Sequence, residues 1–496
     1  MRFFILFKCR TGFLLAFGSA LFAIVACAPV GPDYQPPQPS MPSQWGESAV
    51  MDSGGNADAY ARWWSLFHDP LLDDLVRRAI AANPDLKIAE TRIREARALY
   101  RQAVSGHMPS VDAGGSFSNV RQSRNTSDSG RTQDLFQANF DVNWEIDIFG
   151  SIRRQAEAAE ANLAAVTEDQ RTTLISLVTE VARNYVELRA FQQRLAIARE
   201  NSRNQEQTLN LVRNTFHLGL GNELEVAQSE TLLAQTRAEI PTLESGAIQA
   251  MHQLALLLGQ PPQTLKAELP PTDGAPLPAP PLVPLSLPSE LLRQRPDIRS
   301  AERQLAAATA NVGVATADLF PRFSLSALVG LQSPSLSDLV SSSSRFWTVG
   351  PAVNWPLFDG GKRRAVIEAS EAQRLRAELV YEKTVLTALA ETENALVAQD
   401  RERETYEMLK TAVSASQRAT DIALGLYQAG LTPFLNVLQS ENALYQSQDK
   451  QAQSGQRLAI SMIALYKALG GGWQFQLPDT AASSDADSDS PVRNIP

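Results

Sequence analysis

The stretch "GLTPFLNVLQSE" (Gly430–Glu441) repeats the outline of an earlier one, "GLGNELEVAQSE" (Gly219–Glu230). Both open with Gly-Leu, share a Leu-x-Val core and close on Gln-Ser-Glu, and they lie 211 positions apart. A short match of this kind arises by chance in a chain rich in Ala, Leu, Gln and Glu. What matters is whether the rest of the chain keeps the same spacing.

Longer segments keep this spacing. Residues 83–111 align with 295–323 at an offset of 212, and residues 142–154 ("VNWEIDIFGSIRR") match 353–364 ("VNWPLFDGGKRR") with one gap. The chain is therefore an internal duplication. A repeat of this length determines the architecture before any local assignment is made, and it predicts two equivalent halves.

Helical patterns dominate each half. Between Gly150 and His217 there is neither proline nor glycine. A helix of that length would reach ~100 Å at 1.5 Å per residue. An apolar seam with the three-and-four spacing of a coiled coil runs through Leu174, Val178, Val181, Tyr185, Leu188 and Leu195. We expect helices at 70–106, 150–217 and 222–258 in the first half, and at 289–317, 362–428 and 433–469 in the second.

Four short segments alternate between apolar and polar residues instead. In "LFQANFDVNWEI" (135–146) the apolar side carries Phe136, Ala138, Phe140, Val142 and Trp144. Segments 110–120, 322–331 and 346–355 show related patterns, and their length, alternation and terminal aromatic residues are typical of membrane-barrel strands. Four strands cannot close a barrel, and open edges in lipid would leave backbone N–H and C=O groups unpaired. Either the strands form a soluble meander or identical chains complete the barrel; the second is favoured, because no spare element is available to cover the apolar stripe.

The amino terminus resembles a bacterial lipoprotein signal. Arg2, Lys8 and Arg10 precede a 16-residue apolar stretch (11–26) that runs into "IVAC" (24–27), with Cys27 as the residue to be acylated. The alternative is ordinary cleavage after Ala28, which would leave Pro29 directly behind the cut. With acylation, Cys9 leaves with the signal segment and Cys27 is the only cysteine of the mature chain, so no disulfide framework or thiolate metal site is expected.

The expected order of segments is as follows. A signal peptide (1–26) and an extended segment (27–69) come first. The first repeat (70–259) contains a β-hairpin (110–146) and a helical hairpin (150–258), and a Pro-rich connector (260–288) links it to the second repeat (289–470), with its own β-hairpin (322–355) and helical hairpin (362–469). A carboxyl-terminal segment (471–496) ends in a disordered acidic tail.

Composition and motifs argue against catalysis, cofactors and nucleic acid. The four histidines stand far apart, and none has a Cys or a second His at metal-ligand spacing. Glu145 and Asp147 are two positions apart in a strand, which indicates pore lining rather than an acid–base pair. The net charge is −9 and the basic residues are scattered, so no nucleic-acid surface is expected.

Several long motifs, in the right order, resemble those of the outer-membrane channels of tripartite efflux pumps, the TolC-like proteins. Within that family the chain is most similar to the lipoprotein branch of NodT type. The resemblance covers nearly the whole mature chain and rests on "CAPVGPDYQPP" (27–37), "WEIDIFGSIRR" (144–154), "RPDIRSAERQLAAATANVGVATADLFPRFSL" (295–325) and "VGPAVNWPLFDGGKRRA" (349–365). It implies a mainly α fold with a small β part: a homotrimer with a shared 12-stranded barrel in the outer membrane of a Gram-negative bacterium and a periplasmic α-barrel. A periplasmic adaptor and an inner-membrane transporter of the RND type would be its partners.

The same resemblance implies a passive exit duct for drugs, solvents or similar small molecules. The alternatives are a channel for metal-ion efflux or type I protein secretion, and, more remotely, a non-conducting coiled-coil lipoprotein.

The opening repeat would then be the two hairpin turns at the periplasmic tip, with turn residues Gly219, Gly221, Gly430 and Pro433. By resemblance, Tyr427 matches the gate aromatic residue and Glu225 an acidic gate position. Asn436 and Gln439 occupy positions that are usually acidic, so a ring of amides would replace a ring of carboxylates. We expect weaker cation selectivity from such a ring.

Overall fold

The computed structural model describes residues 29–46, 61–121, 123, 125, 132–270 and 288–474. These form two compact units. The described residues of 1–39, 91–168 and 299–384 make up the strand unit, and those of 40–90, 169–298 and 385–496 make up the hairpin unit. The signal peptide, Cys27, most of the Pro-rich connector and the acidic tail lie outside the described residues, so those predictions remain predictions.

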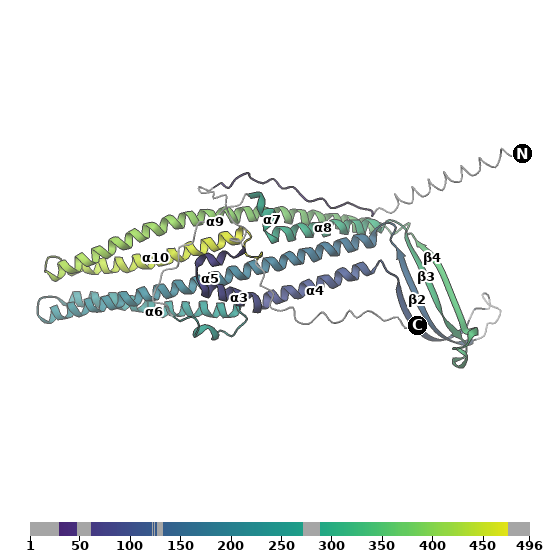
Figure 1. Cartoon of the computed structure of the whole chain (residues 1–496), viewed down its shortest axis with the longest axis horizontal. Helices are drawn as coiled ribbons and strands as arrows, with labels where there is room; N and C mark the ends of the chain where they lie inside the picture. The colour runs from purple at the N-terminus through teal and green to yellow at the C-terminus, as the bar shows by residue number, and fades with distance from the viewer. Residues whose placement is uncertain are drawn as a thin grey trace. The chain divides into compact units, whose positions relative to one another are not determined.

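The strand unit contains one four-stranded antiparallel sheet (Figure 1). Its strands are β1 (Ser110–Arg121), β2 (Thr132–Ile146), β3 (Arg322–Ser333) and β4 (Arg345–Asn354), in that spatial order. The expectation of a mainly helical chain with four antiparallel strands is therefore confirmed. Within the described residues β1 and β4 each pair with one neighbour only, so both edges of the sheet carry unpaired backbone groups.

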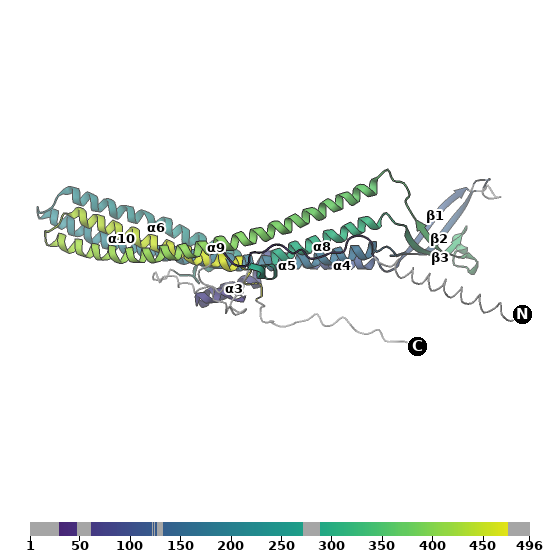
Figure 2. The ribbon, with the colours of Figure 1, turned by 90° about the horizontal axis from the view of Figure 1, so that it is seen from above.

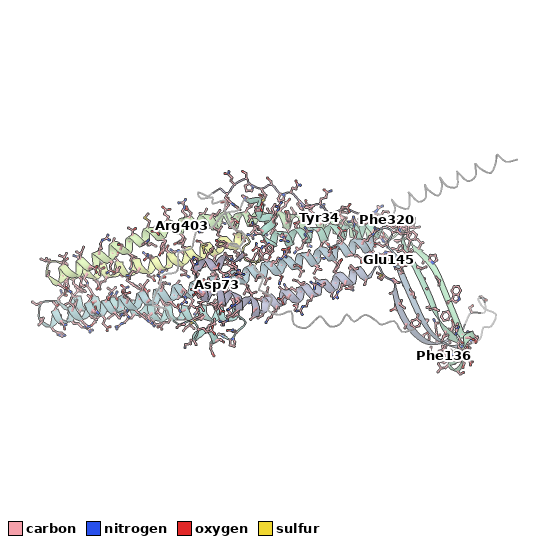
Figure 3. All side chains as sticks on the ribbon, in the orientation of Figure 1. Tyr34, Asp73, Phe136, Glu145, Phe320 and Arg403 are labelled. Carbon is pink, nitrogen blue, oxygen red and sulfur yellow. The ribbon has the colours of Figure 1, made fainter. Side chains whose placement is uncertain are left out.

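The strand register separates the two faces of this sheet. Residues directly opposite one another share a face, and successive residues alternate between faces. One face carries apolar rows that run across neighbouring strands: Ala113, Phe140, Val329 and Trp347 in one row, and Val111, Val142, Ala327 and Val349 in another. Rows on the opposite face are mostly polar, for example Ser116, Gln137 and Gln332, with Leu328 and Phe346 among the exceptions. Figure 3 shows these side chains, with Phe136 and Glu145 labelled near opposite ends of β2.

Two tryptophans occupy equivalent places in the two β-hairpins. The indole N–H of Trp144 donates to the carbonyl of His107 (2.9 Å), and that of Trp355 to the carbonyl of Leu319 (3.2 Å). Each bond joins the end of a hairpin's second strand to the loop before its first strand. The duplication seen in the sequence is thus repeated in the side-chain contacts.

Asp147 does not lie in a strand as expected. It follows the last residue of β2, and its carboxylate accepts from the backbone N–H groups of Ile152 (3.2 Å) and Arg153 (2.9 Å). The carboxylate therefore satisfies the free N–H groups at the start of a helix, where its negative charge also complements the helix dipole. Asp359 does the same in the second half, accepting from the N–H of Arg363 at 3.1 Å.

Four long helices come in two pairs of equal length. They are α5 (Ser151–His217) and α6 (Glu223–Leu257) in the first half, and α9 (Lys362–Gln428) and α10 (Phe434–Ala468) in the second. α5 and α9 each have 67 residues, and α6 and α10 each have 35. In the hairpin unit these helices lie side by side as two hairpins (Figure 2). None of the helices that the structure describes is long and apolar enough to cross a membrane.

The shorter helices are broken where single helices were expected. Residues 70–106 form α3 (Pro70–Ala82) and α4 (Pro84–Ser105), and residues 289–317 form a short α7 (Leu291–Gln294) followed by α8 (Pro296–Ala317). The expected continuous helices were wrong at both aligned prolines. Proline lacks an N–H and pushes the residue before it out of the helical region, and both Asn83 (ψ 129°) and Arg295 (ψ 116°) are extended.

The core of the hairpin unit joins segments from both ends of the chain. Trp63, in a short 3₁₀ helix (Trp63–Phe67), stacks on Tyr466 of α10 with ring centroids 5.5 Å apart. The indole N–H of Trp473 donates to the carbonyl of Gln294 (2.8 Å), and the Arg171 guanidinium lies 4.7 Å from the centroid of the same Trp473 ring. These contacts join the end of α10 and the segment that follows it to the 3₁₀ helix, α7 and α5.

A candidate gate at the two hairpin turns

The two turns named by the opening motif have the same backbone geometry. Gly219 and Gly430 both have φ +71°, a conformation that costs glycine little because it has no Cβ. The N–H of Leu220 donates to the carbonyl of Thr215 (3.0 Å), and that of Leu431 to the carbonyl of Leu426 (2.9 Å). Both are Schellman motifs, in which a glycine ends the helix and the backbone reverses.

The returning helices begin differently in the two halves. Asn222 caps α6, and its side-chain oxygen accepts from the N–H of Glu225 at 3.0 Å. In the second half Pro433 occupies the cap position just before α10, rather than its first turn, and makes no side-chain cap. Gly221 has no positive φ, so its role is not to reverse the chain.

Glu225 and Tyr427 meet across the two hairpins. The Tyr427 hydroxyl donates to Glu225 Oε2 (3.2 Å), and the tyrosine ring lies 5.3 Å from the ring of Phe434. Burial, and then the nearby Glu225 carboxylate, raise the pKa of Tyr427 to about 12, because both disfavour a phenolate there. The phenol therefore stays a hydrogen-bond donor at any physiological pH.

An apolar cluster supports this contact. Val212 of α5 and Phe434 and Val437 of α10 are buried together, and Val226 and Tyr427 pack against them. All four long helices thus contribute to one small core next to the turns. Such a core resists separation of the hairpins, since parting them exposes apolar surface.

The two amides do not join the Glu225–Tyr427 pair. Asn436 and Gln439 are exposed on α10, and the Asn436 side-chain amide donates to Thr432 Oγ1 at 2.5 Å. Of the residues expected at the gate, the fold therefore brings together Glu225 and Tyr427, while Asn436 and Gln439 face outward from the single chain.

A polar seam between the hairpins was not expected from the sequence. Bonds across it join Thr208 to Glu441 (2.5 Å), Asn201 to Gln448 (2.7 Å), Arg194 to Asp449 (2.6 Å) and Tyr445 to Glu239 (2.6 Å). Glu441 closes the repeated motif, and its counterpart Glu230 instead forms an exposed ion pair with Arg213. Only the packing of one hairpin on the other separates these two roles.

A cavity of about 410 Å³ lies along this seam, lined by residues of α5, α9 and α10. Gln205 and Glu441 are both among its lining residues. Gln205 is 2% exposed, and within the described part of the chain neither of its amide atoms has a hydrogen-bond partner. Burial raises the pKa of Glu441, and the bond from Thr208 only partly offsets this.

Glu441→Gln is expected to raise the melting temperature at neutral pH. The amide keeps an oxygen that accepts from Thr208 but removes the cost of burying a charge. Because the pKa of Glu441 lies above 4.5 in the folded protein, wild-type stability falls as pH rises from 4.5 through that raised value. The advantage of the variant should therefore shrink below pH 4.5, where the wild-type carboxyl is neutral too. Thermal unfolding from pH 4 to 8 measures this, and an equal advantage at every pH would contradict it.

Comparison with known proteins agrees with this architecture. The sequence profile of the outer membrane efflux protein family matches residues 75–260 and 287–471, one match in each half of the duplication. The chain is 34% identical to the pyoverdine export outer membrane protein OpmQ of Pseudomonas aeruginosa, over 92% of this chain and 97% of that protein. It is 31% identical to nodulation protein T of Rhizobium leguminosarum bv. trifolii, over 90% of this chain and 94% of that protein.

Solved structures show the same fold. The outer-membrane channel OprN superposes with a TM-score of 0.85 and 38% identity, covering 90% of this chain and 99% of that one. CusC superposes with a TM-score of 0.79 and 29% identity, covering 90% and 100%. A duplicated pair of long helical hairpins with a four-stranded sheet thus defines an outer-membrane channel protein. The chain belongs to the outer membrane efflux protein family, whose members are passive conduits rather than enzymes.

Proposed function

We propose that three copies of this chain form one pore, with a shared 12-stranded barrel in the outer membrane. The observation that carries the proposal is the sheet: one face is apolar from strand to strand, and both edges are unpaired. In lipid an unpaired edge costs several kcal/mol per group, so β4 of one copy must pair with β1 of the next. Phe140 and Trp347 are 57% and 74% exposed in the single chain, as lipid-facing residues would be.

The pore continues through the long helices, which line a periplasmic duct in the trimer. A periplasmic adaptor and an inner-membrane transporter of the RND type supply cargo and energy, and the channel itself conducts passively. Curated relatives include a toluene efflux pump and a solvent efflux pump outer membrane protein of Pseudomonas putida, at 32% and 33% identity. Drugs, solvents and similar toxic small molecules are accordingly the proposed cargo, in preference to metal ions or secreted proteins.

Drug export and pore formation are tested separately. Deletion of the gene should sensitise cells to a panel of drugs and solvents. The unheated purified protein should migrate as a trimer and raise the conductance of a planar bilayer. A monomer without conductance would refute the pore, whereas a conducting trimer with unchanged susceptibility would refute only the cargo.

Cys27 is the proposed acylation site and anchors the mature amino terminus in the outer membrane. Two or more acyl chains make such anchoring stable. Metabolic labelling with a palmitate analogue should mark the wild type and not Cys27→Ser. Labelling of both, or of neither, would refute it.

The gate is proposed to lie at the hairpin turns, where Tyr427 and Glu225 hold the two hairpins together. Asn436 and Gln439 are exposed on the single chain, which suits residues that meet their copies around an axis. Amides neither repel one another nor attract cations as carboxylates do.

Asn436→Asp combined with Gln439→Glu is expected to increase cation selectivity and to introduce block by divalent cations. Single-channel recordings with and without millimolar Mg²⁺ measure both. Gln446→Glu is the matched control, because it adds a charge on the exposed side of the same helix, further from the turn. Strong divalent block of the wild-type channel at neutral pH would refute the amide ring.

A further inference from the structure

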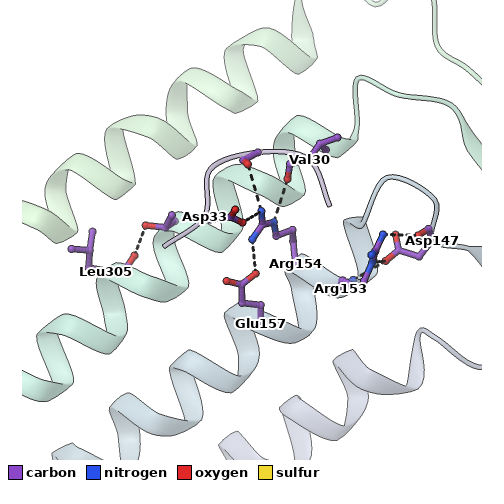
Figure 4. Close-up of polar contacts among 9 residues, drawn as sticks. Val30, Asp33, Asp147, Arg153, Arg154, Glu157 and Leu305 are labelled. Carbon is purple, nitrogen blue, oxygen red and sulfur yellow. Dashed lines mark hydrogen bonds and ion pairs between the residues drawn. The ribbon is translucent and has the colours of Figure 1, made fainter. Parts of the chain in front are cut away.

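The first described residues of the chain form a strap, residues 29–34, that packs against the strand unit. Its main contact is Arg154 near the start of α5, whose side chain is 3% exposed (Figure 4). The guanidinium donates to the carbonyls of Val30 (3.2 Å) and Gly31 (3.4 Å) and to the carboxylate of Asp33 (2.6 Å). Its remaining ion pair is with Glu157, at 2.8 Å.

Two further bonds continue the docking on either side of Arg154. The N–H of Val30 donates to the carbonyl of Phe149 (3.0 Å), in the turn between β2 and α5. The hydroxyl of Tyr34 donates to Glu302 of α8 (2.9 Å). The strap therefore bridges the two halves of the duplication, since α5 belongs to the first half and α8 to the second.

The strap packs so closely that three glycine positions leave no room for a Cβ. A Cβ on Gly31 would lie 2.5 Å from the Cα of Gly313, and a Cβ on Gly150 would lie 2.5 Å from the Cβ of Pro29. A Cβ on Gly313 would come within 2.9 Å of the Arg154 side chain. Real Cβ atoms do not approach other atoms this closely, so three glycines are needed for the strap to dock.

The duplication supplies an internal comparison. The counterpart of Arg154 in the second half is Arg364, which is exposed. The counterpart of Gly313 in the first half is Arg101, which is exposed. The arginine pair at the start of the long helix is thus repeated, but within the described residues only Arg154 is buried against the strap, whereas Arg364 is exposed.

We propose that Arg154 is the positioning residue that docks the amino-terminal strap, and that this docking holds the anchored end of the chain beside the strands. Phe149, whose carbonyl accepts from Val30, stacks on Phe320, two residues before β3, with ring centroids 4.7 Å apart. The strap begins two residues after Cys27 in the sequence. This second part rests on the proposed acylation, whereas the docking itself does not.

Hydrogen exchange of the full-length protein in detergent tests the docking. Arg154→Met is expected to speed exchange of the amides between Val30 and Gln35 by about tenfold or more, because the strap loses three charge-assisted bonds. Arg153→Met is the matched control, since Arg153 neighbours Arg154 but pairs with Asp147. It should leave strap exchange unchanged. Arg154→Lys should restore protection only in part, because one ammonium cannot reproduce the fork of a guanidinium.

A second variant guards against simple misfolding. Asp33 is 83% exposed, so Asp33→Ala removes one partner of Arg154 without opening a core. It should speed strap exchange by a few fold while exchange in α5 stays unchanged. Equal strap exchange in wild type, Arg154→Met and Asp33→Ala would overturn the docking.

The link between strap docking and the lipid anchor has its own test. Arg154→Met should lower the amount of trimer in the outer membrane, and this loss should be greater in the acylated protein than in a Cys27→Ser background. An equal loss in both would refute the link to the anchor, and neither readout depends on drug export.

Discussion

Phe140→Arg is expected to abolish insertion into the outer membrane, whereas Asn139→Arg at the neighbouring position should insert as the wild type does. Phe140 lies in the apolar row with Val329 and Trp347, and Asn139 lies on the opposite, polar face between Gly114 and Gly330. An arginine facing lipid near the bilayer midplane costs about 2–4 kcal/mol. Each proposed trimer would carry three of them, whereas an arginine facing a water-filled pore is solvated.

The two variants differ by one position, so expression, charge and helix content are matched. Outer-membrane fractionation and the heat-stable trimer band on unheated gels give the readout. If Asn139→Arg fails and Phe140→Arg inserts, the two faces are assigned the wrong way round. If both insert normally, the strands do not contact lipid and the chain does not form the proposed barrel.

Tyr427→Phe and Glu225→Gln are expected to shift the tip towards the open state. A hydrogen bond to a carboxylate contributes about 1.5–3 kcal/mol, and the partial exposure of this pair favours the lower end. That corresponds to roughly tenfold in the ratio of closed to open states for each chain. Because three chains would act on one aperture, the effect on the trimer is larger. Phe434 keeps its apolar partner in Tyr427→Phe, so the variant removes the bond and little else.

Planar-bilayer recordings should show higher open probability for each variant, and cells should become more sensitive to large antibiotics that the outer membrane normally excludes. The double variant should add little to Tyr427→Phe alone, since Tyr427→Phe already removes the hydrogen bond that Glu225→Gln weakens by taking away the charge of the acceptor. Thr432→Ser, near the second turn but outside this pair, is the control. If the effects of the two single variants on open probability add fully in the double variant, or if open probability does not change, the Tyr427–Glu225 contact does not hold the gate closed.

The pH dependence of the wild-type channel follows from the same contact. Below pH 10 the phenol of Tyr427 is protonated whether packed or free, so the bond to Glu225 is fully present. As pH rises from 10 towards about 12, a freed phenol ionises before the packed one does, and closure weakens. Tyr427→Phe should not respond in this window, which separates the contact from general alkaline unfolding.

Repetition and periodicity were sufficient to predict most of the architecture. The fixed offset predicted paired elements, and the structure has two helices of 67 residues and two of 35. Alternation of apolar and polar residues predicted the strands and their apolar face, because side chains in a strand alternate strictly. The family expectation, which rested on long motifs, was confirmed. Roles assigned to Cys27, Asn436 and Gln439 remain predictions.

Local patterns failed where a residue acts on a distant partner or on the backbone. Asp147 was expected in a strand, but it follows β2 and its carboxylate caps α5, and the helices expected to be continuous break at Pro84 and Pro296. The breaks were readable in principle, since proline disfavours helix at the residue before it. The capping role of Asp147 could not be predicted in this way, because the strand-like alternation of the sequence continues one residue past the end of β2.

Periodic burial of apolar groups is a local property, and the amino-acid order alone was therefore enough to define the duplication, the long helices and the two-faced sheet. Contacts between segments hundreds of positions apart are not local. The bond from Tyr427 to Glu225, the burial of Glu441 beside Thr208 and the docking of the strap on Arg154 depend on which helix faces which. Equivalent residues of the two halves took different roles: Arg154 meets the described part of the amino-terminal segment, whereas Arg364 is exposed.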